Sequence, residues 1–260
     1  MIKMKPGSII IFLNFIFIFF SKVESNNSVS FIRRQNGFER VIAARSEKTE
    51  DIEKKFSDKK IGYPPSRIFL RCFKNEKEIE LWSESPDSGK FVLIKKFKMT
   101  GSSGVLGPKR KSGDLQVPEG FYFIERFNPV SNFYLSLGIN YPNQSDKILG
   151  NKENPGCDIF IHGGDATIGC IPIGDKNIKE LYLIALDVKS NGQKNIPVHI
   201  FPCKMTDENV NNILKPLCGT NKSLKIFWNN LKEGYDIFEK IKRIFDYSIN
   251  KTGGYVFRAE

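Results

Sequence analysis

Short segments rich in β-branched and aromatic residues run through the middle of the chain. Polar turns such as KNEK and SPDSG separate the first three, which predicts a meander of antiparallel hairpins. Seven segments fit the strand pattern: 67–73, 78–84, 90–99, 120–127, 132–139, 157–162 and 196–202. The central part of the chain is therefore predicted to be mostly β-sheet.

Helical spacing appears between the last two of these segments. Asp175 is a residue type that caps helix N-termini, and Ile178, Leu181, Tyr182 and Ala185 follow it at helical intervals. This pattern predicts a helix that starts at Asp175, with a loop in front of it.

The C-terminal part of the chain has helical spacing in two consecutive stretches. Gly234 lies between them and predicts the end of the first helix. The apolar positions are Leu224, Phe227, Trp228 and Leu231 in the first stretch, and Tyr235, Phe238 and Ile241 in the second. Aromatic residues at this spacing are typical of core packing.

The first 25 residues are typical of a secretory signal, with lysines followed by an apolar run. That run, from Ile9 to Phe20, is shorter than the roughly 20 residues that a membrane-spanning helix needs. We therefore expect a signal peptide at 1–25, a polar N-terminal arm at 26–60, a β-rich domain at 61–203 and a helical C-terminal extension at 204–260. The predicted fold class is mainly β with α: a twisted sheet or sandwich with these helices.

The chain of 260 residues carries a formal net charge of +11. An exported basic protein has two natural partners, an anionic membrane surface and an anionic cell-wall polymer. Solubility alone is the alternative explanation of the charge. The chain contains no nucleic-acid-binding motif, and export also argues against nucleic acid as a partner.

Five cysteines are an odd number, so at least one thiol is free or paired between chains. Cys203 and Cys218 would close a short loop and are the candidate pair. The two histidines and the scattered cysteines show no metal-ligand spacing, so we expect neither a metal nor a cofactor.

The stretch DIFIHGGDATIGCIPIGD places a histidine and a cysteine on either side of a loop of small residues. A thiol becomes a strong nucleophile when an imidazole takes its proton, and acyl transfer also needs donors for the oxyanion. His162 and Cys170 could form the pair. Gly163, Gly164 and Gly169 would let a substrate approach the backbone, and a following helix N-terminus would favour the thiolate. A structural or disulfide-bonded Cys170 is the alternative.

The segment IHGGDATIGCIPI resembles the catalytic signature of the L,D-transpeptidase (YkuD-type) family, in which an HG pair precedes a Ser/Thr-x-Gly-Cys run. The short loop between histidine and cysteine is similar to that of the YafK-like branch. The segments GPKRKSGDLQVPEGFYFI, FPCKMTDENV and FWNNLKEGYDIFE resemble that branch as well. The resemblance covers about residues 60–245, and it implies that residues 61–203 are the catalytic domain.

The resemblance implies a role for each residue of the motif. Cys170 would be the nucleophile, His162 the base, and the carbonyl of Gly163 would orient the imidazole. Thr167 would occupy the Ser/Thr position and Gly169 would lie beside the nucleophile. With Gly164, the last two are the expected oxyanion or substrate-binding residues.

One position departs from the family pattern. Many members carry arginine two residues after the cysteine, where this chain has Pro172. Lys109, Arg110 and Lys111 are candidates to replace that charge, with solvated surface charge as the alternative. Asp114 and Glu119 could line the cleft, although turn and capping roles suit them better, and His199 is expected to be structural.

The resemblance further implies an exported acyltransferase of the periplasm or cell envelope. It would act on peptidoglycan stem peptides through a thioester on Cys170, as a transpeptidase or as a hydrolase. A wall-anchored lipoprotein is a further candidate partner, and a membrane-proximal location would suit the basic charge. The alternative is a catalytically inactive wall-binding module.

Overall fold

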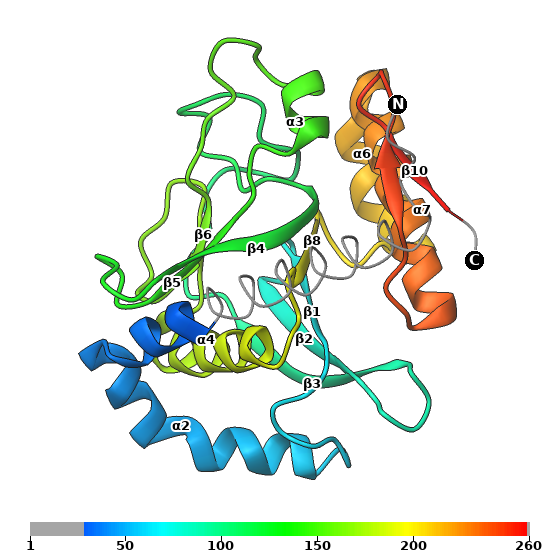
Figure 1. Cartoon of the computed structure of the whole chain (residues 1–260). Coiled ribbons are helices and arrows are strands. Elements are labelled where there is room, and N and C mark those ends of the chain that lie inside the picture. Colours follow the sequence, from blue (N-terminus) through cyan, green and yellow to red (C-terminus); the bar gives the residue numbers. More distant parts are fainter. Residues whose placement is uncertain (1–28, 259–260) are drawn as a thin grey trace, which may run out of the picture.

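The computed structural model describes residues 29–258. The expected signal peptide, residues 1–25, lies outside the described residues. One sheet of eight strands forms the centre of the described chain, in the order β3-β2-β1-β8-β4-β5-β6-β7 (Figure 1). The strands are β1 Ile68–Phe73, β2 Glu78–Glu84, β3 Phe91–Lys98, β4 Gly120–Asn128, β5 Ser136–Ile139, β6 Phe160–His162, β7 Ile171–Pro172 and β8 Pro197–Phe201.

Strand β8 joins the two halves of the sheet. It runs parallel to β1, the first strand of the predicted β1–β3 meander, and antiparallel to β4. The second half is the antiparallel run β4–β5–β6, which ends in the parallel pair β6 and β7. The seven predicted strands are present and the two-residue β7 is an addition, so the mainly β fold with helices is confirmed.

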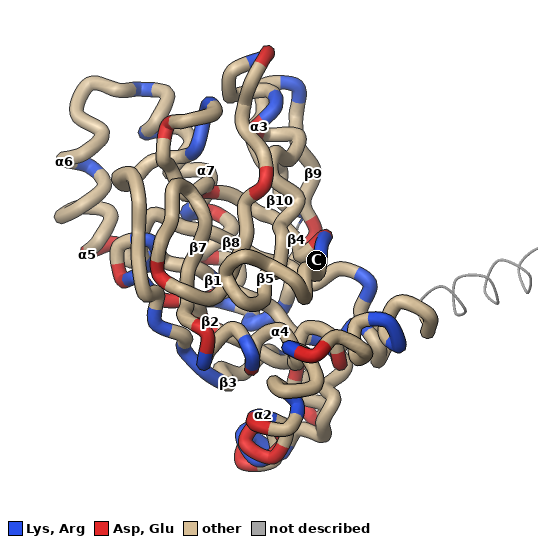
Figure 2. Tube along the Cα trace, turned by 90° about the vertical axis from the view of Figure 1, so that its left-hand side faces the viewer, with Lys and Arg blue, Asp and Glu red and all other residues tan. Residues whose placement is uncertain are grey.

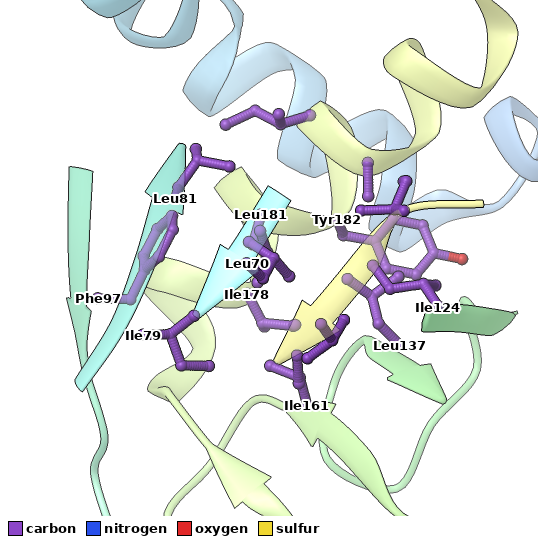
Figure 3. Close-up of a cluster of buried hydrophobic side chains, with 14 of the residues drawn as sticks. Leu70, Ile79, Leu81, Phe97, Ile124, Leu137, Ile161, Ile178, Leu181 and Tyr182 are labelled. Atoms are coloured by element: carbon purple, nitrogen blue, oxygen red, sulfur yellow. The ribbon is translucent and has the colours of Figure 1, made fainter. Parts of the chain in front are cut away.

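Strand β1 contributes to two cores because successive side chains of a strand point to opposite faces. Leu70 and Cys72 pack with the helix α4 (Gly174–Ser190), whereas Phe69 and Phe73 pack with the helix α7 (Lys222–Ile241). Figure 3 shows the first core, in which Leu181 of α4 lies over the sheet. The sheet is therefore the middle layer between two helical layers.

The helix α4 begins one residue earlier than predicted. Its N-terminal capping position is Ile173, and Asp175 lies inside the first turn. The carboxylate of Asp175 instead accepts a hydrogen bond from the backbone N–H of Gly164, at 2.8 Å. The capping prediction for Asp175 was therefore wrong, because this side chain serves the preceding loop.

The segment expected to be a polar arm is helical and packed. Residues 29–36 are helical, and the helix α2 (Glu39–Ser57) lies along α4 (Figure 1). Lysine, arginine and acidic residues alternate along most of α2, as Figure 2 shows, which hides its narrow apolar stripe in the sequence. The stripe is buried and consists of Val41, Ala44, Ile52 and Phe56.

The C-terminal region contains one long helix and a hairpin. The helix α7 continues through Gly234, where an added Cβ would lie 2.6 Å from the ring of Phe121. Gly234 therefore permits close ring packing and does not end a helix, contrary to the prediction. The hairpin β9 (Tyr247–Ile249) and β10 (Tyr255–Phe257) was not predicted. Shorter helical turns precede α7: α5 Asp207–Asn209, a π-helical turn Val210–Leu214 and α6 Lys215–Cys218.

The expected pairing of Cys203 with Cys218 is absent. All five cysteines are free thiols, and both members of the candidate pair are buried in the core beneath α7. Burial raises the pKa of the Cys203 thiol to about 12. These side chains act as small apolar groups in that core.

A buried arginine connects β1 to α7. Arg71 is almost fully buried, and its guanidinium forms an ion pair with Glu239 of α7 at 2.6 Å. Four aromatic rings surround the guanidinium at 4.6–5.6 Å, from Phe73, Phe201, Tyr235 and Phe238. Cation–π contacts of this kind compensate part of the cost of burying the charge.

A second buried ion pair, between Glu119 and Lys74, connects the loop before β4 to the sheet and to the helix α7. The Glu119 carboxylate accepts hydrogen bonds from Lys74 at 2.9 Å, from the indole of Trp228 at 2.7 Å and from the N–H of Gly107 at 2.8 Å. Lys74 also donates to the carbonyls of Gly107 and Val117. Glu119 therefore holds both ends of the 107–119 loop and does not line a cleft.

Replacing Glu119 by glutamine should destabilise the protein strongly. The change leaves the buried Lys74 ammonium without its counter-charge, which typically costs about 3–5 kcal/mol. Urea unfolding followed by circular dichroism measures the loss. Asp58→Asn, which breaks an exposed ion pair with Lys54, is the control and should change little. Equal effects of the two changes would contradict a central role for Glu119.

Stability should decrease as the pH falls because of His199. This side chain lies between Phe69 and Phe121, and burial together with the nearby Arg71 holds its pKa well below the ordinary value. The His199 imidazole therefore binds a proton near pH 6.5 in the unfolded state, whereas in the folded state it stays neutral at this pH. His199→Phe should reduce the loss of unfolding free energy between pH 7.5 and 5.5 by about 1 kcal/mol. Parallel pH profiles for both proteins would contradict this.

Candidate active site

The register of β6 and β7 brings His162 and Cys170 together. Ile161 pairs with Ile171 in this parallel ladder, so Cys170 stands level with Phe160. Phe160 and His162 are two residues apart and share one face of the sheet, at a distance of about 7 Å along the strand. Cys170 directly precedes β7, and its Sγ lies along β6, 3.4 Å from the backbone nitrogen of Phe160 and 3.5 Å from the carbonyl oxygen of Asp158. The thiol and the His162 imidazole therefore come from adjacent segments of the sheet.

His162 is held as a neutral base. Its Nδ1 lies 2.6 Å from the carbonyl oxygen of Gly163, which can only accept, so Nδ1 carries the proton. Nε2 is then the unprotonated nitrogen, and it is buried without a hydrogen-bond partner within residues 29–258. The ring of Phe133 packs against the imidazole at 4.5 Å. Burial lowers the pKa of His162, and the Gly163 carbonyl opposes this in part.

Cys170 is a protonated thiol in this geometry. Burial raises the pKa of the thiol above its ordinary value. The N–H of Phe160, 3.4 Å from Sγ, and the Lys109 charge act in the opposite direction. The helix α4 begins at Gly174, beyond β7, and does not supply the thiolate stabilisation expected from the sequence. The resting pair is thus a thiol and a neutral imidazole.

Thr167 and Gly169 shape the loop that carries the nucleophile. The Thr167 hydroxyl donates to the carbonyl of Cys170 at 2.8 Å and accepts from the N–H of Gly169 at 3.2 Å. Gly169 has φ +130°, and an added Cβ would lie 3.1 Å from the carbonyl oxygen of Gln116. Both residues therefore position Cys170, and the N–H of Gly169 is engaged within the loop.

Gly163 is required by close packing around the histidine. An added Cβ would lie 2.4 Å from the Asp175 carboxylate and 2.6 Å from the Phe133 carbonyl. Gly164 is also occupied by the protein: its N–H donates to Asp175, and its carbonyl accepts from the Thr100 hydroxyl at 2.7 Å. The backbone of Gly164 therefore braces the loop, whereas the sequence suggested contact with substrate.

Three supporting residues were missed in the sequence. Thr100, Phe133 and Asp175 come from three separate segments, and each contacts the loop or the histidine. Residues 132–139 were predicted as one strand, whereas β5 starts at Ser136 and Phe133 lies in the turn before it. No local pattern could have shown that these segments meet.

The three basic residues at 109–111 lie in different surroundings. Lys109 is buried, donates to the Asp114 carboxylate at 2.7 Å, and contributes to the potential at Cys170. Arg110 turns toward Asp146, at 3.7 Å, and Lys111 is exposed. Of the three, Lys109 is therefore the candidate to replace the charge missing at Pro172.

Asp114 has the turn role that its sequence position favours. Its carboxylate accepts hydrogen bonds from the backbone N–H groups of Arg110, Lys111 and Gln116. These bonds, with the Lys109 ion pair, hold the pKa of Asp114 below its ordinary value although burial opposes them. Asp114 thereby fixes the loop that presents Lys109.

Neither a metal-binding cluster nor a membrane-spanning helix is found in the part of the chain that the structure describes. Within residues 29–258, no three histidine, cysteine, aspartate or glutamate side chains come together in a way that could hold a metal ion. No helix in that part of the chain is long and apolar enough to cross a membrane.

Comparison with known proteins gives a family for this geometry. Residues 70–200 match the model of the L,D-transpeptidase catalytic domain (YkuD). YafK of Escherichia coli (strain K12) is 30% identical over 204 residues, which cover 78% of this chain and 77% of YafK.

Solved structures with a similar fold have lower identity. The helical cell shape determining protein Pgp2 from Campylobacter jejuni is 20% identical, with 76% of this chain and 81% of that chain covered and a TM-score of 0.41. Bd1075 of Bdellovibrio bacteriovorus is 18% identical, with 71% and 65% covered and a TM-score of 0.39. The family-model match and the identity to YafK establish that this chain belongs to the L,D-transpeptidase catalytic domain family.

Proposed function

We propose that Cys170 and His162 catalyse acyl transfer on peptidoglycan stem peptides. The observation that carries the proposal is the buried, unprotonated Nε2 of His162, which lacks a partner in the described residues and lies on the strand next to the segment that carries the Cys170 thiol. Membership of the L,D-transpeptidase family supports the choice of substrate.

The reaction would proceed in two steps, acylation of Cys170 and breakdown of the resulting thioester. Nε2 of His162 takes the proton of Cys170, and Sγ forms a bond to the carbonyl carbon of the stem peptide. The C–N bond then breaks, and the imidazolium gives its proton to the leaving amine. The product is a thioester. An amine or a water molecule attacks its carbonyl carbon as His162 removes the proton of the attacking group, the C–S bond breaks, and the imidazolium returns the proton to the Cys170 sulfur. The oxyanion donor in this scheme is the N–H of Cys170, because the N–H of Gly169 is engaged with Thr167.

Two features support an enzyme over an inactive wall-binding module. Cys170 is a free thiol and is partly exposed, so it is not locked in a disulfide. The loop between His162 and Cys170 is fixed by two hydrogen bonds, one donated by the Thr167 hydroxyl to the carbonyl of Cys170 and one accepted by the Asp175 carboxylate from the N–H of Gly164, which preorganise the pair. The proposed location is the periplasm or cell envelope, for which the signal-like segment at 1–25 is the support.

Hydrolysis is the favoured fate of the thioester. An amine acceptor needs a site that excludes water, and a lid over the thioester would have to come from a segment such as residues 131–155. The structure uses this segment for β5 and for α3 (Gln144–Leu149), which has a capping box at Asn143. Phe133 and Ile168 have exposed apolar side chains beside the site, and Cys170 itself is partly exposed, which favours access of water to the thioester. A wall-anchored lipoprotein, released by cleavage of its link to the stem, is the proposed larger substrate.

His162→Ala should reduce Cys170 acylation by about 10²–10⁴-fold, as expected for loss of a general base. Because burial lowers the pKa of His162, the acid limb of wild-type acylation should have its midpoint below the ordinary value of 6.5. Mass spectrometry of the thioester formed at each pH measures both effects. Iodoacetamide labelling at high pH confirms that Cys170 is still accessible in the variant. An acid limb above pH 6.5, or a fully active variant, would remove His162 from the mechanism.

Reaction in ¹⁸O-labelled water distinguishes hydrolysis from transfer. The enzyme is incubated with a wall fragment whose stem peptide carries a lysine-linked peptide. We expect label in the released stem carboxylate, because Cys170 is partly exposed and water can reach the thioester. Muropeptide mass spectrometry detects it, and Cys170→Ala is the blank. A new cross-link without label would show that the enzyme is a transpeptidase and leave the cysteine mechanism intact.

A further inference from the structure

A large cavity lies outside the segments that carry Cys170 and His162. It has a volume of about 930 Å³, within the range of small-ligand sites. Its walls are the N-terminal half of α7, the β9–β10 hairpin, the end of α3 and the 107–110 loop. The mechanism above uses none of these walls.

One loop borders both this cavity and the nucleophile. Gly107, Pro108 and Arg110 line the cavity. Lys109, between them, turns the other way: it binds Asp114, and its Cε would lie 2.8 Å from a Cβ added to Gly156. Further along the same loop, the carbonyl oxygen of Gln116 lies 3.1 Å from a Cβ added to Gly169, the residue before the nucleophile. The loop therefore connects the cavity to the segment that carries Cys170, on a path that a substrate could follow past the scissile bond.

The lining has the chemistry of a peptide site. Six side-chain amides and hydroxyls line the cavity: Asn221, Ser223, Asn229, Asn230, Asn250 and Thr252. Asn221, Asn230, Asn250 and Thr252 already form hydrogen bonds within the protein, which leaves Ser223 and Asn229 as polar groups for a ligand. Ile226 and Leu149 are 69% and 40% exposed and offer aliphatic contacts. Arg110 and Glu233 provide one charge of each sign, which suits a chain that carries both carboxylates and amines.

The same lining argues against a glycan. Sugar rings bind to proteins largely by stacking on exposed aromatic faces. The two aromatic residues of this cavity, Phe227 and Tyr255, are only 7% and 3% exposed. The face of Phe227 is further covered by the Arg110 guanidinium at 4.7 Å.

We propose that this cavity binds the peptide on the amine side of the scissile bond, the part that leaves when the thioester forms. The assignment rests on the acyl-transfer function proposed above and extends it to a second substrate site. The C-terminal region thereby selects substrates in which the stem is linked to another peptide.

The test compares two substrates with the same stem peptide. One releases methylamine and the other releases a short lysine-ended peptide. Ile226→Glu places a carboxylate in the cavity wall and removes an aliphatic contact of up to about 1.5 kcal/mol, equivalent to about tenfold in affinity. We expect KM for the lysine-ended substrate to rise about tenfold, with no change for the methylamine substrate.

Leu217→Glu is the matched control. Leu217 is 55% exposed and lies on α6, outside the cavity, so the same change in chemistry should affect neither substrate. Urea unfolding of both variants confirms that they are folded. An unchanged KM for the lysine-ended substrate in Ile226→Glu, or an equal rise for both substrates, would overturn the proposal.

A binding measurement separates this proposal from the proposed function. Fluorescence anisotropy of the labelled lysine-ended peptide is measured with Cys170→Ala protein, with and without Ile226→Glu. Weaker binding in the double variant supports the cavity assignment even if the wild type turns over neither substrate, a result that would defeat only the acyl-transfer function. Equal binding of the peptide by the two proteins would overturn the assignment. The assignment would also be overturned if the Cys170→Ala protein bound peptide-free glycan strands and Ile226→Glu abolished that binding.

Discussion

The Glu119 carboxylate is the contact on which the arrangement of the protein depends. It joins Lys74 at the end of β1, Trp228 on α7 and the backbone of Gly107. Removing a buried charge from water is costly, and three donors around one carboxylate compensate for that cost only in one geometry. The pair therefore fixes the relative positions of the sheet, the C-terminal helix and the 107–119 loop. The same loop presents Lys109 toward Cys170 and places the Gln116 carbonyl against Gly169.

Two cores of different composition result from this layering. The core under α4 and α2 is mostly aliphatic, whereas the core under α7 is rich in aromatic rings and contains Arg71 and His199. Both polar residues lie on the strands β1 and β8, at positions whose side chains face α7. The aromatic rings stabilise the Arg71 cation but leave His199 in its neutral form. The ion pair and the cation–π contacts of Arg71 thus hold α7 in place against the sheet, and α7 forms one wall of the adjacent cavity.

The strands could be predicted, and the His162–Cys170 pair could be proposed, because the signals of both are local. Segments rich in β-branched and aromatic residues identified seven strands, and the histidine and cysteine motif lies within nine consecutive residues, 162–170. The failures have a common physical cause. The helix α2 buries only one narrow stripe, so its charge dominated the sequence pattern. Gly234 is explained by the ring of Phe121, which is far away in the sequence, and Asp175 bonds to Gly164 of the preceding loop. In each case a tertiary contact outweighed the local preference.

The neutral state of the pair has a consequence for how catalysis begins. Moving the proton from Cys170 to His162 creates two charges in a half-buried site, and burial alone disfavours both, as the shifted pKa values of the two groups show. The protein offers the N–H of Phe160 and the Lys109 cation to the thiolate. It offers the Gly163 carbonyl to the imidazolium. Proton transfer is therefore best coupled to attack on a bound carbonyl, which removes the sulfur charge as it forms. The enzyme would then rest as an unreactive thiol, and the nucleophile would be generated only when a substrate is in place.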